Sequence, residues 1–429
     1  MDIGKDTFNA RKWVQLALVN FSLVALAGVT LRYKINFPLP SVNQKNLLHG
    51  HSHFAFVGWV TLVLMALMVQ YLQVKRPHLN VKKYNIILLL NCLSAYGMFA
   101  GFIAEGYDTI SITFTCICIL FSYIFIFFYW RDLNKVSDPS FAPLWLKASL
   151  FLWAFSSLGA IALAYLMINR IMIQDFYFGA IYFFLHFQYN GWFLFVCFAL
   201  LFSALNRRGI VSSNVVSKKL FYVMALTVVP TYILSIIWLK LPPVLIWIGN
   251  IFGILQLLVL VYFIQLYPLL KKKTFAAFSK TTRWLWTLAS AAFILKVILQ
   301  LLSIIPFLSH YAFAYRPVII GYLHLSFLGI ISFFILGYID FTLRKTNRQL
   351  SKLGMLLFVA GVLVQEFVLM LQGLEALDFK PVKAANMALF YCALVILSGI
   401  IIMIIQFNKK YPALASAQKP DNISISTEN

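Results

Sequence analysis

The stretch His53-FAFV-Gly58-Trp59 lies inside a long apolar run, and two later apolar runs contain the same kind of phrase. The other two phrases read His186-FQYN-Gly191-Trp192 and His324-LSFL-Gly329-Ile330, and the three histidines are 133 and 138 residues apart. An ionisable side chain inside a membrane helix is costly, so a histidine in such a run is a candidate functional residue. Three histidines in one register predict a repeated architecture whose polar groups converge on one region.

The composition around these phrases is that of a membrane protein. The chain is 62% hydrophobic and only 11% charged, with a mean hydropathy of +0.86. A soluble domain carries about a quarter charged residues. Windows of about 20 apolar residues, enough to cross the hydrocarbon core, can be placed twelve times. The expected spans are 13–32, 47–73, 85–105, 108–130, 145–168, 176–205, 219–239, 243–269, 283–307, 314–341, 353–373 and 384–407.

The formal net charge of +22 results from basic residues in the connections between the expected membrane spans. Most Lys and Arg residues fall in alternate connections between the expected spans, as the positive-inside rule requires. This asymmetry predicts a multi-pass membrane protein with both termini in the cytoplasm. Basic connections of this kind attract anionic lipid headgroups, and we expect membrane lipids and not nucleic acid as partners.

The histidine spacing divides the twelve spans into three units of four, about 13–135, 141–272 and 281–410. Each phrase then lies on the second helix of its unit. We therefore expect an all-α fold of twelve transmembrane helices in three pseudo-equivalent four-helix arcs, forming one domain over residues 1–410. Residues 411–429 are polar and are expected to form a disordered cytoplasmic tail.

The second expected helix carries His49, His51 and His53. Because successive helical residues turn by about 100°, His49 and His53 share a face and His51 points the opposite way. One helix can thus offer imidazoles to two spaces, and the pairings we expect are His53 with His324 and His51 with His186. Paired neutral imidazoles are haem ligands. The absence of Cys-x-x-Cys-His excludes covalent c-type haem. A plainer reading also stands, in which each histidine only forms a hydrogen bond to a neighbouring helix.

Two further ionisable residues lie within expected spans. An ammonium group inside a membrane span is costly, so Lys296 either pairs with a carboxylate or a propionate, or its side chain reaches the membrane surface only poorly. Glu366 lies six residues before Gln372 and is either a member of a proton relay or a neutral, hydrogen-bonded acid. The glycine five residues after each histidine has two readings as well: close helix packing, or room for a planar ring.

This pattern of twelve helices with histidines on the second, sixth and tenth resembles subunit I of the haem-copper oxidases and the related nitric oxide reductases. His51-Ser-His53-FAFV-Gly58-Trp59 is similar to the His-x-His-x-x-x-x-Gly-Trp phrase of the cbb-type oxidases, where it belongs to the tenth helix. Leu371-Gln372-Gly373-Leu374 is similar to a Gln-Gly-Leu stretch of the same group.

The resemblance implies haem b, one or two per chain, and leaves a place for copper. His53, or else His49 or His51, matches the family's low-spin haem ligand on the second helix, and His324 matches the ligand on the tenth. His186 matches a copper ligand, and it is also a candidate ligand of a second haem, while His49 is a further candidate metal ligand.

The chain departs from the family at two places. Tyr322 stands where the high-spin haem ligand would be, and the span 219–239 lacks the adjacent histidines that complete the copper site. A second resemblance is to the twelve-helix haem- and copper-binding membrane protein of the bacterial nitric-oxide response.

The resemblance therefore leads us to expect a b-type haem protein of the bacterial inner (cytoplasmic) membrane that transfers electrons or binds or reduces a diatomic gas, O2 or NO. An electron donor and other respiratory subunits are its expected partners. Turnover as an oxidoreductase of the cytochrome oxidase or nitric oxide reductase type remains open. The alternatives are a secondary transporter with a histidine-lined pathway, since Pro230 interrupts the span 219–239, and a cofactor-free scaffold of a respiratory complex.

Overall fold

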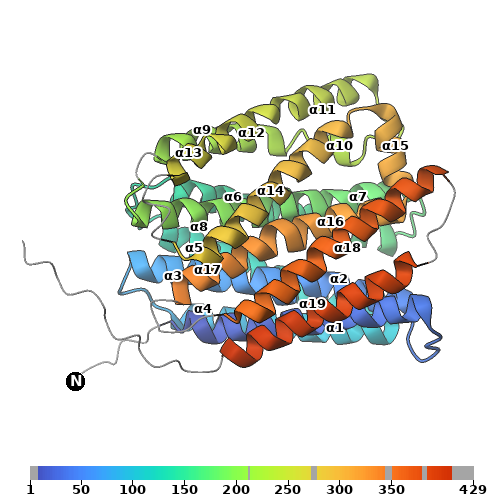
Figure 1. Ribbon diagram of the computed structural model, residues 1–429, viewed down its shortest axis with the longest axis horizontal. Coiled ribbons are helices and arrows are strands. Elements are labelled where there is room, and N and C mark those ends of the chain that lie inside the picture. Colours follow the sequence, from blue (N-terminus) through green and yellow to red (C-terminus); the bar gives the residue numbers. More distant parts are fainter. Residues whose placement is uncertain (1–7, 211–212, 272–277, 344–349, 379–383, 408–429) are drawn as a thin grey trace, which may run out of the picture.

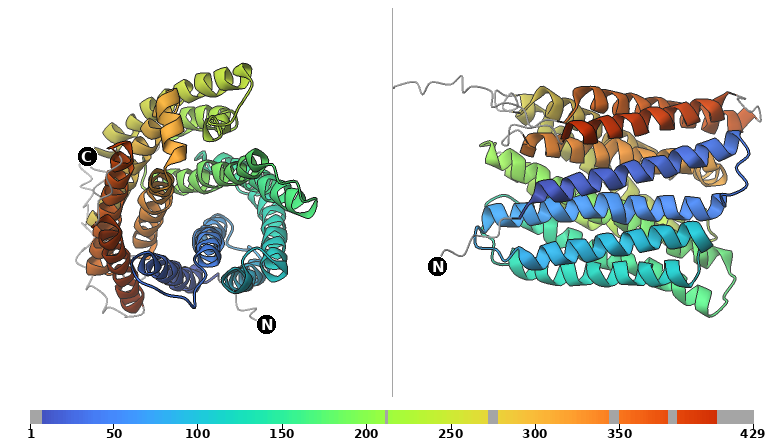
Figure 2. Two further views of the ribbon diagram at one scale, coloured as in Figure 1. Left: turned by 90° about the vertical axis from the view of Figure 1, so that its right-hand side faces the viewer. Right: turned by 90° about the horizontal axis from the view of Figure 1, so that it is seen from below.

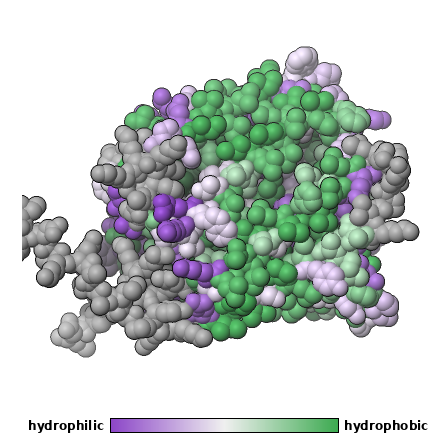
Figure 3. Space-filling model, viewed as in Figure 1, coloured by the Kyte–Doolittle hydropathy of each residue, from purple (hydrophilic) through white to green (hydrophobic). Residues whose placement is uncertain are grey.

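The computed structural model describes residues 8–210, 213–271, 278–343, 350–378 and 384–407. These residues form helices and no strand, which confirms an all-α fold. Eleven described helices are long and apolar enough to cross a membrane, so the chain is a multi-pass membrane protein. The space-filling view shows the corresponding apolar band, with hydrophilic side chains at both ends of the bundle (Figure 3). The predicted tail, 411–429, lies outside the described residues.

The first half of the chain forms the following helices in order: α1 (Ala10–Asn36), α2 (Gln44–Phe54), η1 (Ala55–Thr61), α3 (Leu62–Lys75), α4 (Lys82–Glu105), α5 (Thr109–Leu133), α6 (Ala142–Ile168), α7 (Gln174–His186), η2 (Phe187–Phe193) and α8 (Leu194–Arg207). The segments α2–η1–α3 and α7–η2–α8 are each one continuous rod.

The second half continues with α9 (Ser213–Val228), α10 (Tyr232–Ser235), α11 (Pro243–Leu255), α12 (Leu257–Ile264), α13 (Leu266–Lys271), α14 (Lys280–Leu302), α15 (Pro306–Ala314), α16 (Arg316–His324), η4 (Leu325–Ser332), α17 (Phe333–Leu343), α18 (Lys352–Asp378) and α19 (Ala385–Phe407). Figure 1 shows α1 and α19, from opposite ends of the chain, side by side.

The three histidine phrases share an unusual backbone. Each histidine is followed by a stretch of π-helix, η1 after Phe54, η2 after His186 and η4 after His324. A π segment widens the helix by one residue per turn and is often found at functional sites. The repeat in the sequence is thus also a repeat in local structure.

The phrase-bearing rods form the centre of the bundle. The most apolar windows of these rods are 78%, 94% and 56% buried, more than those of the other eight spans. Phe56, Phe193 and Phe327, one from each rod, contact one another with ring centroids 4.4–5.8 Å apart. Seen along the bundle, the rod α2–η1–α3 stands inside the surrounding helices (Figure 2).

The first helix of each expected unit packs against the π segment of that unit, α1 on η1, α6 on η2 and α14 on η4. Trp59 stacks on Phe21 of α1 with centroids 4.3 Å apart, and Trp192 stacks on Trp153 of α6 at 4.0 Å. These equivalent contacts are compatible with three related units, although the described helices do not by themselves confirm three four-helix arcs.

The phrase glycines allow close packing of helices. A Cβ on Gly191 would lie 2.9 Å from that of Leu152, and one on Gly329 would lie 3.2 Å from that of Ala292. These neighbours belong to α6 and α14, so the packing reading of the two glycines is supported.

The expected span 219–239 is not a continuous helix, and a twelfth unbroken span is not confirmed. Helix α9 ends at Val228, a turn follows, and only the four residues of α10 resume the helix. Pro230 explains the break, because proline has no N–H to donate and its ring clashes with the preceding turn.

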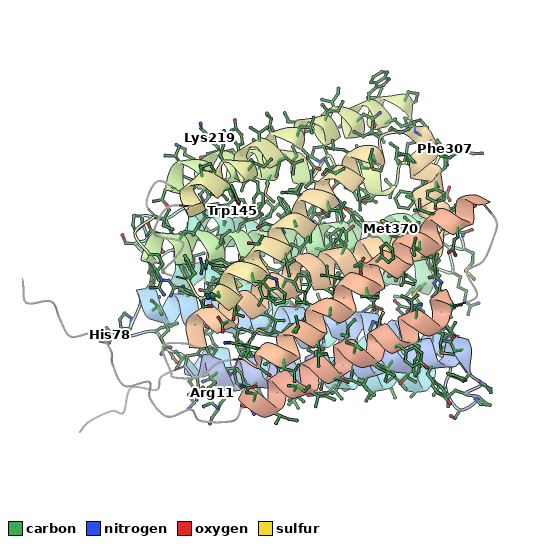
Figure 4. The ribbon with its side chains drawn as sticks, viewed as in Figure 1. Arg11, His78, Trp145, Lys219, Phe307 and Met370 are labelled. Atoms are coloured by element: carbon green, nitrogen blue, oxygen red, sulfur yellow. The ribbon has the colours of Figure 1, made fainter. Side chains whose placement is uncertain are left out.

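Three ion pairs between described side chains lie at one end of the bundle. Asp132 pairs with Arg76 and Lys83, and Asp138 pairs with Lys75. Figure 4 shows Arg11 and His78 toward this end and Phe307 toward the other.

Candidate functional site

The three histidines of α2 point to two different spaces, as the helix geometry predicts. His51 contacts α1, where its Nδ1 lies 2.9 Å from the carbonyl oxygen of Val24. His49 and His53 face the other way and lie against Tyr107, between α4 and α5. Helix α2 therefore contributes imidazoles to two separate sites.

His51 is held in one orientation by α1. A carbonyl oxygen only accepts, so Nδ1 must carry the proton and donate it to Val24. Gly28 makes room for the ring, since a Cβ there would lie 3.3 Å from Cε1 of His51. The other nitrogen, Nε2, then carries the lone pair and makes no hydrogen bond to the described residues.

His324 has the same arrangement on the central rod α16–η4–α17. Its Nδ1 lies 2.8 Å from the carbonyl oxygen of Ile320, one turn earlier in the same helix. Its Nε2 makes no hydrogen bond to the described residues. His324 lies within electrostatic range of His51 and of Arg32, so the three side chains belong to one region.

Two guanidinium groups accompany this histidine pair. Arg32 lies on α1, about one turn beyond Gly28, and is within electrostatic range of Arg316 at the start of α16. Neither arginine has a carboxylate partner among the described side chains. Two cations close together without an anion form a site suited to a negatively charged ligand.

His186 lies in a different environment, and both of its ring nitrogens are engaged. Nε2 lies 2.7 Å from the carbonyl oxygen of Val228, and Nδ1 is 3.2 Å from Ser235 Oγ and 3.1 Å from Asn190 Nδ2. The break at Pro230 explains the first bond, because Tyr232 donates its N–H to Val229 and leaves Val228 without its helical donor. His186 thus satisfies a backbone group at the broken helix.

The structure groups the histidines differently from the expected pairs. His51, not His53, shares a region with His324, and His186 bonds to the α9–α10 segment instead of facing His51. The reason is rotational: the face of α2 that carries His51 packs on α1, and the opposite face meets Tyr107.

The accessory candidates occupy separate places. Lys296 is 4% exposed and donates to Gln300 Oε1 at 2.8 Å, which replaces the expected carboxylate or propionate. Glu366 lies on α18 beside Gly321, and its buried Oε1 has no described partner. Tyr322 stacks edge-on with Tyr189 of η2, with centroids 6.1 Å apart.

A cavity of about 400 Å³ lies between α8, α12, α13 and α14. Its lining is almost entirely apolar, with Leu201, Phe263 and Phe293 among the contributors, and it contains none of the histidines. It is therefore separate from the region of His51 and His324.

Sequence reasoning missed Arg32, Arg316 and Tyr107. All three lie at the edges of expected spans, where charged and aromatic residues are common as interface anchors. The only signal available was that Arg32 and Arg316 each lie within about 20 residues of a candidate histidine on a neighbouring stretch of chain.

No protein-family model matches this chain, and neither does any curated protein. The assignment of function therefore depends on these side chains and their geometry.

Proposed function

We propose that this chain is a membrane b-type haem protein that binds one haem between His51 and His324. The observation that carries the proposal is that the two imidazoles have the same hydrogen-bonding pattern. Each has its Nδ1 proton bound to a backbone carbonyl, at 2.9 and 2.8 Å, and each leaves Nε2 without a described partner in a shared region.

This is the state that a metal-binding histidine requires. A ligating imidazole is neutral, and a hydrogen bond from its second nitrogen fixes the tautomer and the ring plane. Val24 and Ile320 supply those bonds from two different helices. The two imidazoles would therefore already be oriented to bind a haem iron.

Two arginines are suited to bind the propionates of a haem. Haem carries two propionates, and guanidinium groups bind carboxylates through paired hydrogen bonds. Arg32 interacts electrostatically with His51, His324 and Arg316, so these cations lie near the histidines that would hold the iron. We assign Arg32 and Arg316 to the propionates.

A haem with two protein ligands supplies one-electron transfer, so electron transfer is the reaction we favour. Binding or reduction of O2 or NO needs an open coordination position, which a bis-histidine site does not offer. The surrounding residues then orient the ligands and exclude water from the apolar centre.

Copper at His186 does not enter the proposal. Both nitrogens of that ring already form hydrogen bonds, and within the described part of the chain no cluster of three His, Cys, Asp or Glu side chains is suited to a metal ion. The residues around His186 fit a hydrogen-bonded structural role better than a ligand role.

The scaffold we propose is that of haem-copper oxidase subunit I, with twelve crossings in three related units. Arg11 Nη2 and the carbonyl oxygen of Phe407 lie 3.5 Å apart, so the N-terminal end of α1 and the C-terminal end of α19 lie on the same side of the bundle. An even number of crossings is needed for this, and α9–α10 supplies the crossing that the eleven long helices lack. We place both termini in the cytoplasm of a bacterial cell, on the basic side of the inner membrane.

A secondary transporter is the second candidate, and the break in α9 is the observation that favours it. Broken helices whose free backbone groups meet polar side chains form the substrate sites of many transporters. Here Val228, His186 and Ser235 meet at such a break. A transporter of this kind needs no haem, which separates the two candidates experimentally.

The test is the haem content of the purified protein from haem-replete cells, measured as the pyridine haemochrome. We expect about one haem b per chain, and less than a tenth of it in His51→Ala and in His324→Ala. His186→Ala and His53→Ala are the matched controls and should retain haem. A colourless wild-type protein, or unchanged haem in both ligand variants, would contradict the proposal.

A further inference from the structure

The opposite face of α2 carries a second pair of imidazoles. His49 and His53 are one helical turn apart and share a face. Both rings lie against Tyr107, with centroids 4.6 and 5.9 Å from its ring. Two histidines at positions i and i+4 can ligate one metal ion from a single helix.

One nitrogen of this pair lacks a partner. Nε2 of His49 is buried and makes no described hydrogen bond, whereas Nε2 of His53 lies 2.9 Å from the hydroxyl of Tyr107. A buried polar atom without a partner is costly, because it has lost its hydrogen bonds to water. Such an atom beside a second imidazole and a phenol indicates a ligand that would satisfy all three.

The loop that presents Tyr107 is built to hold it in place. Gly106 has φ +76°, and a Cβ there would lie 2.6 Å from Asn46 Oδ1 of α2, so only glycine allows this approach. On the other side, Asp108 caps helix α5 through a reciprocal pair of bonds with Ser111. Tyr107 is therefore fixed over α2 from both directions.

His53 is fixed as well. Its ring stacks on Phe102 of α4 with centroids 4.5 Å apart and an interplanar angle of 18°. Preorganised ligands of this kind bind a metal ion without a large loss of side-chain entropy.

We infer that His49, His53 and Tyr107 bind one divalent first-row transition metal ion, Zn²⁺ or Cu²⁺. Imidazole nitrogens with an oxygen donor suit these ions. Tetrahedral zinc at about 2.0 Å from each ligand needs ligand atoms about 3.3 Å apart. The 2.9 Å between His53 Nε2 and Tyr107 Oη is within a few tenths of an ångström of that spacing.

The proposed site has a tyrosine, Tyr107, as its third ligand. The described residues hold no group of three His, Cys, Asp or Glu side chains suited to a metal, and here the third ligand is a tyrosine. Three protein ligands leave the fourth position for water or an external ligand. Because ligation removes the phenol proton, metal binding should release protons and weaken at low pH.

The test uses full-length protein purified in detergent without a polyhistidine tag, treated with a chelator and then titrated with ZnSO4. We expect one Zn²⁺ per chain by elemental analysis after dialysis. His49→Gln and His53→Gln should each weaken the affinity at least tenfold, and Tyr107→Phe several-fold. His78→Gln and His310→Gln, exposed elsewhere on the surface, are the matched controls and should bind as the wild type does.

Tyr107→Phe keeps the ring packing, and size-exclusion elution with the thermal midpoint shows that each variant is folded. The inference would be overturned if the wild type failed to bind one Zn²⁺ per chain. It would also be overturned if the folded His49→Gln and His53→Gln proteins bound Zn²⁺ with the affinity of the wild type. The result does not bear on the haem proposal, because that proposal depends on His51 and His324 and is tested by haem content.

Discussion

Asp132, at the end of α5, accepts hydrogen bonds from three side chains. Its two oxygens accept from Arg76, Lys83 and Tyr84 at 3.0, 2.5 and 2.7 Å. Removing one side of a buried ion pair leaves the other charges uncompensated and typically costs about 3–5 kcal/mol. Because Arg76 and Lys83 are partly exposed, we expect a cost near the lower end of that range for Asp132→Ala.

Thermal unfolding in detergent measures this cost. Asp175→Ala, at an exposed position at the start of α7, is the control and should change the midpoint little. Equal midpoints for the two variants would show that the Asp132 network does not stabilise the bundle.

Asp138, in the connection after α5, predicts a dependence of stability on pH. Burial alone raises the pKa of this carboxyl, but hydrogen bonds from Lys75, the Ser140 N–H and Tyr71 together hold the pKa below its ordinary value. A lowered folded-state pKa stabilises the protein above the unfolded pKa of about 3.9, and the stabilisation is lost as pH falls through the folded pKa.

We therefore expect the thermal midpoint of the wild type to fall more steeply than that of Asp138→Asn between pH 6 and pH 3. Parallel midpoints over this range would contradict the assigned role of Asp138.

At the residue scale, the sequence identified His51 and His324 as candidate ligands but predicted a different partner for each of them. Rotation on a helix predicts that His51 and His53 face apart, yet not which face meets α1. The choice depends on Val24 and Gly28, whose contacts with His51 join segments more than twenty residues apart.

At the scale of the helix, the π segments set the angle between each histidine and the rest of its rod. Deleting Ala55 from η1 would remove a residue of the wide π turn and change the direction of α2 relative to α3, so that His51 moves away from His324. We expect a folded protein with less than a tenth of the wild-type haem. Deleting Asn80, in the connection after α3, is the control and should leave the haem content unchanged. Full haem in the Ala55 deletion would refute this role of η1.

The contact between α18 and α19 depends on glycine. A Cβ on Gly399 would lie 2.6 Å from the backbone nitrogen of Phe358, which cannot move without its helix. We expect Gly399→Ala to destabilise the bundle by about 1–3 kcal/mol. Gly179→Ala, where the nearest atom is 3.8 Å away, is the matched control in a thermal-unfolding series. Equal effects of the two changes would argue against close backbone packing here.

Hydropathy predicted the helices but not their interior irregularities. Eleven expected spans correspond to long described helices because apolar length alone determines them. The π segments carry no compositional mark that distinguishes them from α-helix. Pro230 signalled an interruption, but the pairing of the freed Val228 carbonyl with His186 depends on tertiary packing.

At the scale of the whole molecule, the contact of Arg11 with Phe407 fixes the relation of the two ends. If α9–α10 crosses the membrane, single cysteines at Gly209 and Lys240 in a cysteine-free background must react with impermeant reagents from opposite sides. Reaction of both positions from the same side would leave eleven crossings and contradict the proposed scaffold.

The threefold arrangement was predictable only as far as the spacing of the histidine phrases. The structure adds the central contacts of Phe56, Phe193 and Phe327, which no periodicity could supply. The described helices share the local features of a repeat, and the arcs themselves remain a proposal.

The most direct test of the central claim is the absorption spectrum of the dithionite-reduced protein before and after carbon monoxide is added. If His51 and His324 fill both axial positions, the wild type should show sharp b-type bands that carbon monoxide does not shift. A spectrum without haem bands, or one that carbon monoxide shifts in the wild type, would contradict a haem bound by both histidines.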